Sequence, residues 1–153
     1  MTFAFLVDSC GNEGKTSAEM SPDSGKGIIA NQLGRDTLAT GCYSMIASRD
    51  TSFMQINSKG SLITGSLSYN FYQKDRNDGT VQAELNGDLL SGWYLFRSEG
   101  VMSVRQVAWK IKGTELWPAI GQMMERGDTM MFADEGKIRF DSAHVFKKVP
   151  CTL

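Results

Sequence analysis

Residues 81–97 read VQAELNGDLLSGWYLFR and contain two alternating segments joined by a tight turn. The residues at every second position share one face, and they are Val81, Ala83 and Leu85 before the turn and Leu90, Gly92, Tyr94 and Phe96 after it. A period of two is typical of a strand with one buried face. Asn86-Gly87 favours a two-residue hairpin turn, because both residues tolerate positive φ. The segment therefore predicts an antiparallel β-hairpin.

The same pattern extends in both directions from this hairpin, with turn signals about every 8–12 residues from Cys42 onward. The predicted strands are 42–48, 52–57, 62–73, 81–85, 90–97, 103–111, 115–123, 129–132, 138–140 and 144–149. A meander of about eight to ten short strands must protect two exposed edges, and closure into a barrel removes both. We expect an all-β fold, an antiparallel up-and-down barrel, with a β-sandwich as the alternative.

Residues 1–38 differ in character from the rest of the chain. The apolar segment 3–7 is followed by Ser9-Cys10 and then by an aperiodic polar segment that ends near Gly27. This order resembles the end of a bacterial lipoprotein signal peptide, in which the cysteine receives the lipid. The resemblance implies lipidation at Cys10. We expect residues 1–38 to be a signal remnant and flexible tether, with a loose helix near 27–38, and residues 39–153 to be the barrel domain. The alternative is a frayed terminus with an unrelated cysteine.

The other two of the three cysteines lie at opposite ends of the predicted barrel. Cys42 begins the first strand and Cys151 follows the last, and in a closed meander these strands are antiparallel neighbours. We expect a disulfide between Cys42 and Cys151, with two separate buried thiols as the alternative. A disulfide would indicate an oxidising compartment, which agrees with export.

Composition excludes several classes of partner. Sixteen Lys and Arg against seventeen Asp and Glu leave a net charge of −1, so no basic field is available for nucleic acid. No apolar segment approaches the roughly 20 residues that a membrane-spanning helix needs. Residues 11–16 look like the end of a phosphate-binding loop, but position 9 is Ser9 instead of glycine and the flanking strand and helix are missing.

Chemistry is also constrained by the side chains available. The one histidine, His144, has no zinc-like Cys or His spacing around it, so we expect no metal and place His144 at the surface. Residues 75–79 only faintly resemble a calcium loop and are better explained as a hairpin loop. We expect no cofactor and no enzyme activity. An uncharacterised hydrolase that uses His144 as its base is the minor alternative.

Six residues are candidates for binding a ligand inside the barrel: Tyr69, Phe71, Tyr94, Phe96, Arg105 and Trp109. The aromatic side chains either line a cavity or fill the interior of a barrel this small. Arg105 falls on the same strand face as Trp109, so we expect it to be partly buried. A buried guanidinium needs a partner, which is either Glu99 across the turn or an anionic ligand at the barrel mouth.

Several segments of the chain beyond residue 38 resemble one family. They are Gly41-Cys42-Tyr43, Gly79-Thr80-Val81, Gly87-Asp88, Tyr94-Leu95-Phe96, Ser98-Glu99-Gly100, Ser103-Val104-Arg105 and Lys147-Lys148-Val149-Pro150-Cys151. Together they resemble small envelope lipoproteins of Bacteroidetes-type bacteria, a family without an assigned activity. The meander is also similar to lipocalin-like and avidin-like barrels, an analogy that transfers no ligand residues.

The resemblance implies location in the bacterial cell envelope, lipid-anchored to the membrane and facing the periplasm or the surface. We expect a non-enzymatic protein whose lipocalin-like barrel binds a small apolar or anionic ligand or a partner protein. The alternative is a lipocalin-like inhibitor or scaffold that acts through its surface loops.

Overall fold

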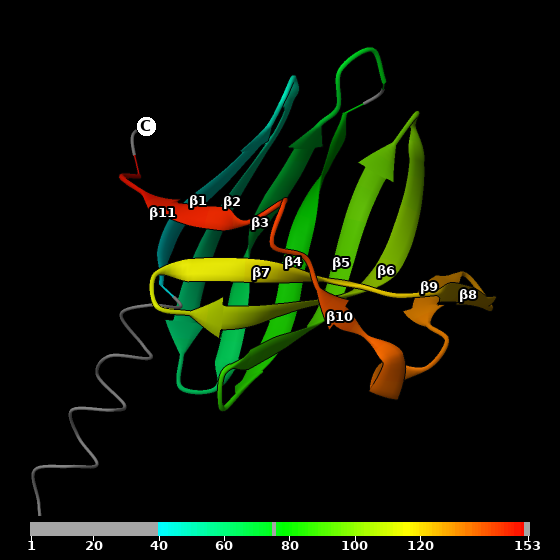
Figure 1. The fold of residues 1–153 in the computed structure, drawn as a ribbon. Coiled ribbons are helices and arrows are strands. Elements are labelled where there is room, and N and C mark those ends of the chain that lie inside the picture. Colours follow the sequence, from blue (N-terminus) through cyan, green and yellow to red (C-terminus); the bar gives the residue numbers. More distant parts are fainter. Residues whose placement is uncertain (1–39, 75, 152–153) are drawn as a thin grey trace, which may run out of the picture.

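The computed structural model describes residues 40–74 and 76–151 and consists of β-strands with one short 3-10 turn (Figure 1). The strands are β1 (Gly41–Ala47), β2 (Asp50–Lys59), β3 (Leu62–Asn70), β4 (Asn77–Asn86), β5 (Leu89–Ser98), β6 (Val101–Lys112), β7 (Glu115–Ile120), β8 (Met123–Arg126), β9 (Thr129–Phe132), β10 (Arg139–Phe140) and β11 (Phe146–Val149), and the 3-10 turn is η1 (Glu135–Lys137). Within the described ranges there is no helix with the length and apolar character needed to cross a bilayer.

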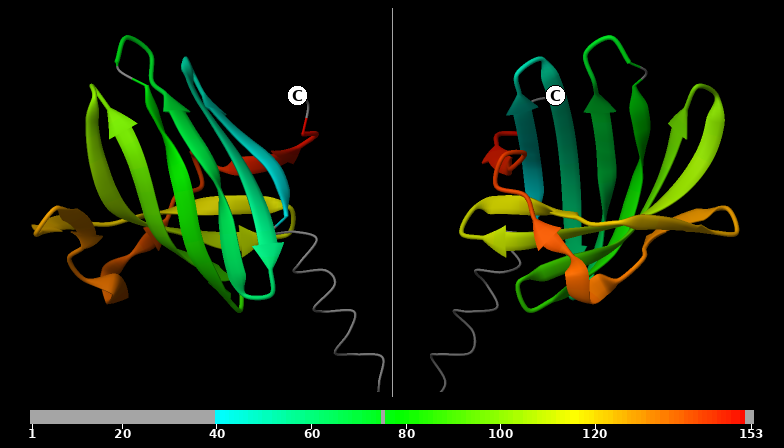
Figure 2. Two further views of the ribbon diagram at one scale, coloured as in Figure 1. Left: turned by 180° about the vertical axis from the view of Figure 1, so that it is seen from behind. Right: turned by 45° about the vertical axis from the view of Figure 1, so that its right-hand side comes forward.

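Eight strands of the described chain form a closed antiparallel barrel. The ring runs from β1 through β7 in order, continues from β7 to β11, and returns from β11 to β1. The β8–β9 hairpin lies outside the ring on β6, and β10 lies on β7 (Figures 1 and 2). The predicted all-β barrel is confirmed, and the β-sandwich alternative is wrong. The purely consecutive strand order is also wrong, because the chain leaves the ring between β7 and β11.

Alternation of buried and exposed residues builds the core as the sequence predicts. Inward-facing side chains from all the long strands pack into one cluster that includes Tyr43, Met54, Ile56, Ile63, Leu67, Val81, Leu90, Tyr94, Trp109, Leu116 and Phe146. Three inward positions are glycines: Gly65, Gly79 and Gly92. A Cβ at any of them would lie 2.1 Å from a backbone oxygen of the adjacent strand. Glycine therefore permits the close strand approach that curves this sheet into a ring.

Several strand boundaries differ from the prediction, and two of these differences affect the loops of the barrel. Residues 115–123, expected to be one strand, divide into β7 and β8, which are separated by Gly121 and Gln122. Pro118 has no N–H to donate to the ladder, so pairing between β6 and β7 stops at the Trp109–Pro118 pair. The loop predicted at 75–79 lies earlier in the chain, because β3 ends at Asn70 and β4 already begins at Asn77.

A disulfide closes the barrel at its seam. Cys42 is bonded to Cys151, with 5.2 Å between their Cα atoms and a sequence separation of 109. Cys42 also pairs in the ladder with Val149 of β11. The predicted disulfide is therefore confirmed, and the prediction of two separate thiols is wrong. The predicted tether, the helix near 27–38 and the lipidation site at Cys10 lie outside the described residues.

Candidate functional site

Along one of its edges, β6 pairs with two different strands. The first half of this edge pairs with β9 at Val104 and Arg105, and the second half pairs with β7 from Trp109 onward. Residues 106–108 therefore lie between two ladders that run to different strands. Because Pro118 ends the β7 ladder, β7 continues toward β10 and away from β6.

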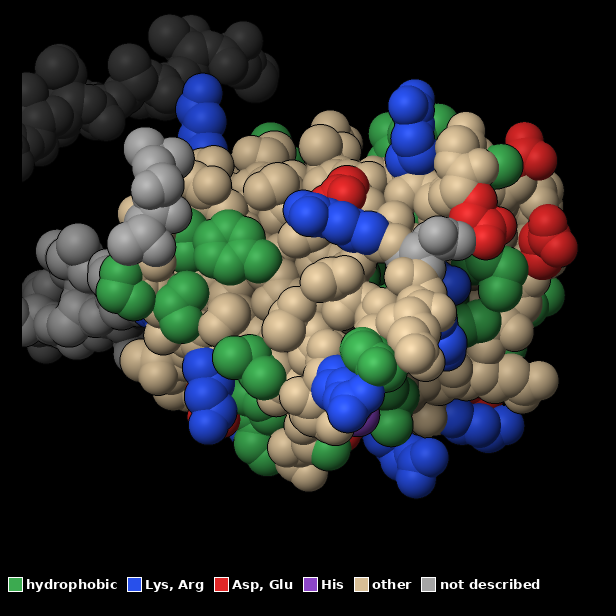
Figure 3. All heavy atoms as spheres, turned by 90° about the horizontal axis from the view of Figure 1, so that it is seen from above, with side chains coloured by type: hydrophobic (Ala, Val, Ile, Leu, Met, Phe, Trp, Pro, Cys, Tyr) green, Lys and Arg blue, Asp and Glu red, His purple; other side chains and the backbone are tan. Residues whose placement is uncertain are grey.

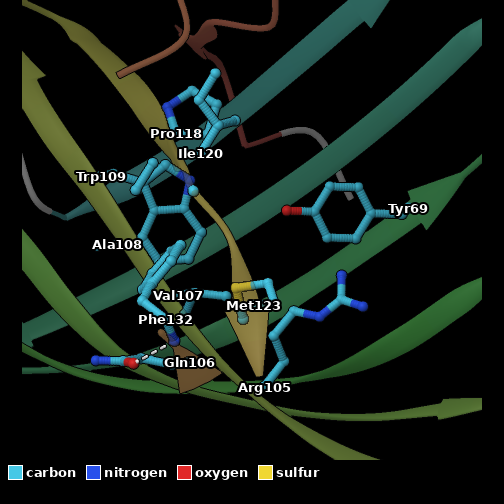
Figure 4. Close-up of a pocket in the computed structure, with 12 residues that line it drawn as sticks. Tyr69, Arg105, Gln106, Val107, Ala108, Trp109, Pro118, Ile120, Met123 and Phe132 are labelled. Atoms are coloured by element: carbon cyan, nitrogen blue, oxygen red, sulfur yellow. Dashed lines mark hydrogen bonds between the residues drawn. The ribbon is translucent and has the colours of Figure 1, made fainter. Parts of the chain in front are cut away.

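A pocket of about 250 Å³ lies at this division, and we call it the wall pocket. Its lining consists of Tyr69, Arg105, Gln106, Val107, Ala108, Trp109, Pro118, Ala119, Ile120, Gly121, Met123 and Phe132. Most of these side chains are apolar. Figure 4 shows Trp109 and Phe132 on one side of the pocket, with Tyr69 and Arg105 facing them from the other. The pocket thus has an apolar wall opposite two polar groups.

Trp109 supplies a polar atom that has no partner. The residue is only 1% exposed, and its indole Nε1–H makes no hydrogen bond within the described structure. An indole nitrogen can only donate, and an unmet buried donor costs on the order of 1–3 kcal/mol. A residue that borders the wall pocket therefore carries a buried donor whose hydrogen-bonding capacity is unused.

Tyr69 and Arg105 add two further donors. The Tyr69 hydroxyl forms no hydrogen bond with another described residue. Burial raises the pKa of Tyr69 to about 12, although the positive charge of Arg105 acts in the opposite direction. The hydroxyl therefore keeps its proton at neutral pH. Around the Arg105 guanidinium, no carboxylate of residues 40–74 or 76–151 lies within ion-pairing distance.

Gln106 fixes the hairpin that forms one side of the pocket. Its Oε1 accepts a hydrogen bond from the backbone N–H of Phe132 at 3.0 Å, and its Nε2 donates to Glu135 Oε1 at 2.8 Å. One side chain of β6 therefore holds both the end of β9 and the turn η1. Both polar atoms of the Gln106 amide are thus oriented by the β9 and η1 segments.

The six predicted ligand residues divide into three groups. Tyr69, Arg105 and Trp109 line the wall pocket. Tyr94 and Phe96 are buried in a stacked pair with 4.7 Å between ring centroids, and the Tyr94 hydroxyl donates to the carbonyl of Leu67. Phe71 stacks on Tyr69 with 5.6 Å between centroids. Part of the aromatic set thus fills the barrel, and part borders a pocket.

Arg105 differs from its prediction in two respects. It faces the interior beside Phe96, with 5.8 Å from its Cζ to the ring centroid, yet it is exposed instead of partly buried. The division between β6 and β7 leaves this level of the barrel open to solvent. The expected ion pair with Glu99 does not form, because Arg105 pairs with Tyr94, several rungs along the ladder from the turn that contains Glu99.

The chain matches no protein-family model, no curated protein and no solved structure. The resemblances to envelope lipoproteins and to lipocalin-like barrels therefore stay predictions. What the wall pocket does must be argued from its own chemistry.

Other chemistry-bearing groups lie away from the wall pocket. His144 is exposed in the segment between β10 and β11, where its Nδ1 lies 2.6 Å from Asp141 Oδ2. A hydrogen bond from the Ala143 backbone N–H, and then the contact with His144, lower the pKa of Asp141. Among the described residues, no three His, Cys, Asp or Glu side chains are grouped so that they could hold a metal ion.

Charge on the surface is dispersed. Figure 3 views the end of the barrel that carries the β1–β2, β3–β4 and β5–β6 turns. Lys and Arg side chains are spread over the described part of this face, with hydrophobic and polar groups between them. Short-range contacts, such as Arg76 with Asp78 at 2.8 Å beside the β3–β4 turn, neutralise some of this charge locally.

The sequence did not single out the β7–β9 side of the pocket. Pro118, Met123 and Phe132 border it only because the chain leaves the ring after β7. The available signal was a proline inside a predicted strand, followed three residues later by Gly121. This combination marks the end of a ladder.

Proposed function

We propose that this protein is a non-enzymatic binding protein that holds a small, mostly apolar molecule in the wall pocket. The observation that carries the proposal is the Trp109 Nε1–H, which is buried and has no hydrogen-bond partner in the described structure. Ligand pockets combine an apolar lining with a few polar groups that fix orientation. The wall pocket has this composition, with Trp109, Tyr69 and Arg105 as the orienting groups.

The size of the pocket limits the ligand. Its volume of about 250 Å³ lies just below the roughly 300–1,000 Å³ typical of pockets for drug-sized molecules. The barrel interior beyond it is filled by side chains such as Tyr94 and Phe146. We therefore expect a small ligand, or one end of a longer chain whose remainder projects into solvent.

The indole N–H resonances test this function directly. The protein has three tryptophans, and each gives one signal in a ¹⁵N-correlated NMR spectrum. We expect hexanoic to decanoic acids, alcohols or amides to shift the Trp109 signal. Trp93 is exposed and Trp117 Nε1 donates to Glu115 at 3.0 Å, so their signals serve as internal controls. If no compound moves the Trp109 signal, ligand binding is overturned and the scaffold alternative is favoured.

We also propose that the protein acts in the bacterial cell envelope, anchored to the membrane by a lipid on Cys10. The Cys42–Cys151 disulfide supports this location, because such bonds persist in oxidising compartments. The order of residues around Cys10 supports the anchor. The barrel would then sit close to the membrane, where amphipathic molecules are concentrated.

Metabolic labelling with a palmitate analogue in a Gram-negative host tests the anchor. We expect the label on the wild-type chain and complete loss of it in Cys10→Ala. Ser24→Ala, a change in the polar segment that follows Cys10, is the matched control and should keep the label. Equal labelling of wild type and Cys10→Ala would overturn the anchor.

A further inference from the structure

Hydrogen-bond donors predominate among the polar groups of the wall pocket. Trp109 Nε1–H and the Arg105 guanidinium can only donate hydrogen bonds, and the Tyr69 hydroxyl, which keeps its proton at neutral pH, can donate as well as accept. The amide oxygen of Gln106 accepts from the Phe132 backbone N–H. Donors and one positive charge therefore predominate among the side chains that line the pocket, and an acceptor is the complementary ligand group.

The positive charge of Arg105 indicates that the acceptor group of the ligand is anionic. Arg105 is the one ionisable cation in the lining, and no described carboxylate pairs with it. A guanidinium beside a planar carboxylate can form two parallel hydrogen bonds, which are stronger than hydrogen bonds between neutral groups. A single cation matches a single negative charge, whereas a phosphate dianion would leave excess charge next to an apolar wall.

The apolar residues of the lining indicate that the rest of the ligand is apolar. Val107, Ile120, Met123 and Phe132 contribute aliphatic, thioether and aromatic surface. Methionine adapts to irregular apolar shapes. A polar body, such as a sugar or an amino acid zwitterion, would leave its own polar groups unmet against these side chains.

We infer that the wall pocket binds an amphipathic monocarboxylate, a short fatty or aryl-alkyl acid, whose carboxylate is held by Arg105 and Tyr69 with Trp109 N–H as a third donor. This inference rests on the proposed binding function and names its ligand class. The acid packs its apolar body against Val107 and Met123, and its carboxylate faces Arg105 and Tyr69.

Calorimetric titration of the full-length protein with octanoate, octanamide and octyl phosphate tests the class. We expect octanoate to bind at least about tenfold more tightly than octanamide, since a hydrogen bond to a charged group contributes more than one to a neutral group. Arg105→Gln should remove this preference and leave octanamide binding within about twofold. Arg97→Gln, a change on the exposed outer side of β5, is the matched control and should alter neither.

A second variant keeps the test independent of any folding defect in Arg105→Gln. Tyr69→Phe removes only a hydroxyl, and we expect it to weaken octanoate binding about three- to tenfold with little effect on octanamide. Arg105→Lys keeps the charge but loses the paired geometry, so it should retain part of the preference.

The outcomes separate the two proposals. Equal affinity for octanoate and octanamide would overturn the carboxylate inference while the pocket remains a binding site. Tighter, Arg105-dependent binding of octyl phosphate would overturn it in favour of a phosphorylated ligand. If none of the three compounds binds or moves the Trp109 indole signal, the binding function itself fails, and the inference with it.

Discussion

At the residue scale, two buried tyrosine hydroxyls differ in whether they make a hydrogen bond. The Tyr94 hydroxyl donates to the Leu67 carbonyl at 2.9 Å, whereas the Tyr43 hydroxyl is buried without a partner in the described structure. We predict that Tyr94→Phe lowers the free energy of unfolding by about 1 kcal/mol, and that Tyr43→Phe leaves it unchanged or raises it. Urea unfolding of both variants measures this. A larger loss in Tyr43→Phe than in Tyr94→Phe would contradict it.

The same burial predicts a response to alkaline pH. Burial raises the pKa of Tyr43 and of Tyr69 from 10.0 to about 12. The folded state therefore keeps these protons to higher pH than the unfolded chain. Their contribution to stability is fully present below pH 10 and is lost as the pH rises toward 12. Urea midpoints between pH 9 and 12 should fall, and Tyr43→Phe/Tyr69→Phe should flatten the decline.

Sequence periodicity was enough to place individual side chains, but not to define their partners. Tyr69, Arg105 and Trp109 were predicted to share the interior, and alternation within each strand is sufficient for that. Whether Arg105 meets Glu99 or solvent depends on the register of β5 with β6 and on where β7 leaves the ladder. Those are properties of neighbouring strands, which a pattern within one strand does not contain.

At the element scale, Gly92 controls how closely β5 can approach β4. A Cβ there would lie 2.1 Å from Gln82 O and 2.4 Å from Ala83 Cα, both backbone atoms that cannot move without shifting the strand. We predict that Gly92→Ala destabilises the barrel by about 3 kcal/mol, at the upper end of the cost of overpacking. Ser91→Ala, one residue away on the outer side of β5, is the control. Wild-type unfolding of Gly92→Ala would show that the sheet relaxes easily.

Strand positions could be predicted wherever turn residues bracket an alternating segment. Asn86-Gly87 fixed the β4–β5 hairpin, and β9 has the bounds expected for 129–132. The prediction failed at 115–123, where apolar residues continue through the end of a strand. The β6–β7 ladder ends at Pro118, and the effect of a proline depends on which edge of its strand faces a neighbour. The wall pocket exists because of this one element boundary, so the sequence predicted its inner residues and missed its outer wall.

At the scale of the whole molecule, closure depends on short ladders between distant parts of the chain. β11 pairs with β1 only at Cys42–Ser44 and with β7 only at Leu116 and Glu115, while the β2–β3 ladder extends over nearly the full length of both strands. The ring is therefore least secured at its seam. The disulfide lies at that point and joins residues 109 positions apart.

This placement predicts that the disulfide supports the whole barrel. In the chain-entropy model, a cross-link closing roughly 100 residues contributes about 4–5 kcal/mol, although measured values run lower. We predict that Cys42→Ser/Cys151→Ser lowers the free energy of unfolding by about 2–5 kcal/mol, measured in guanidinium chloride. Hydrogen exchange should quicken first in β11 and β1, because a seam held by few pairs opens before the β3–β5 sheet. Uniform acceleration in every strand would instead mean that the ring opens only by global unfolding, with no weak seam for the disulfide to secure.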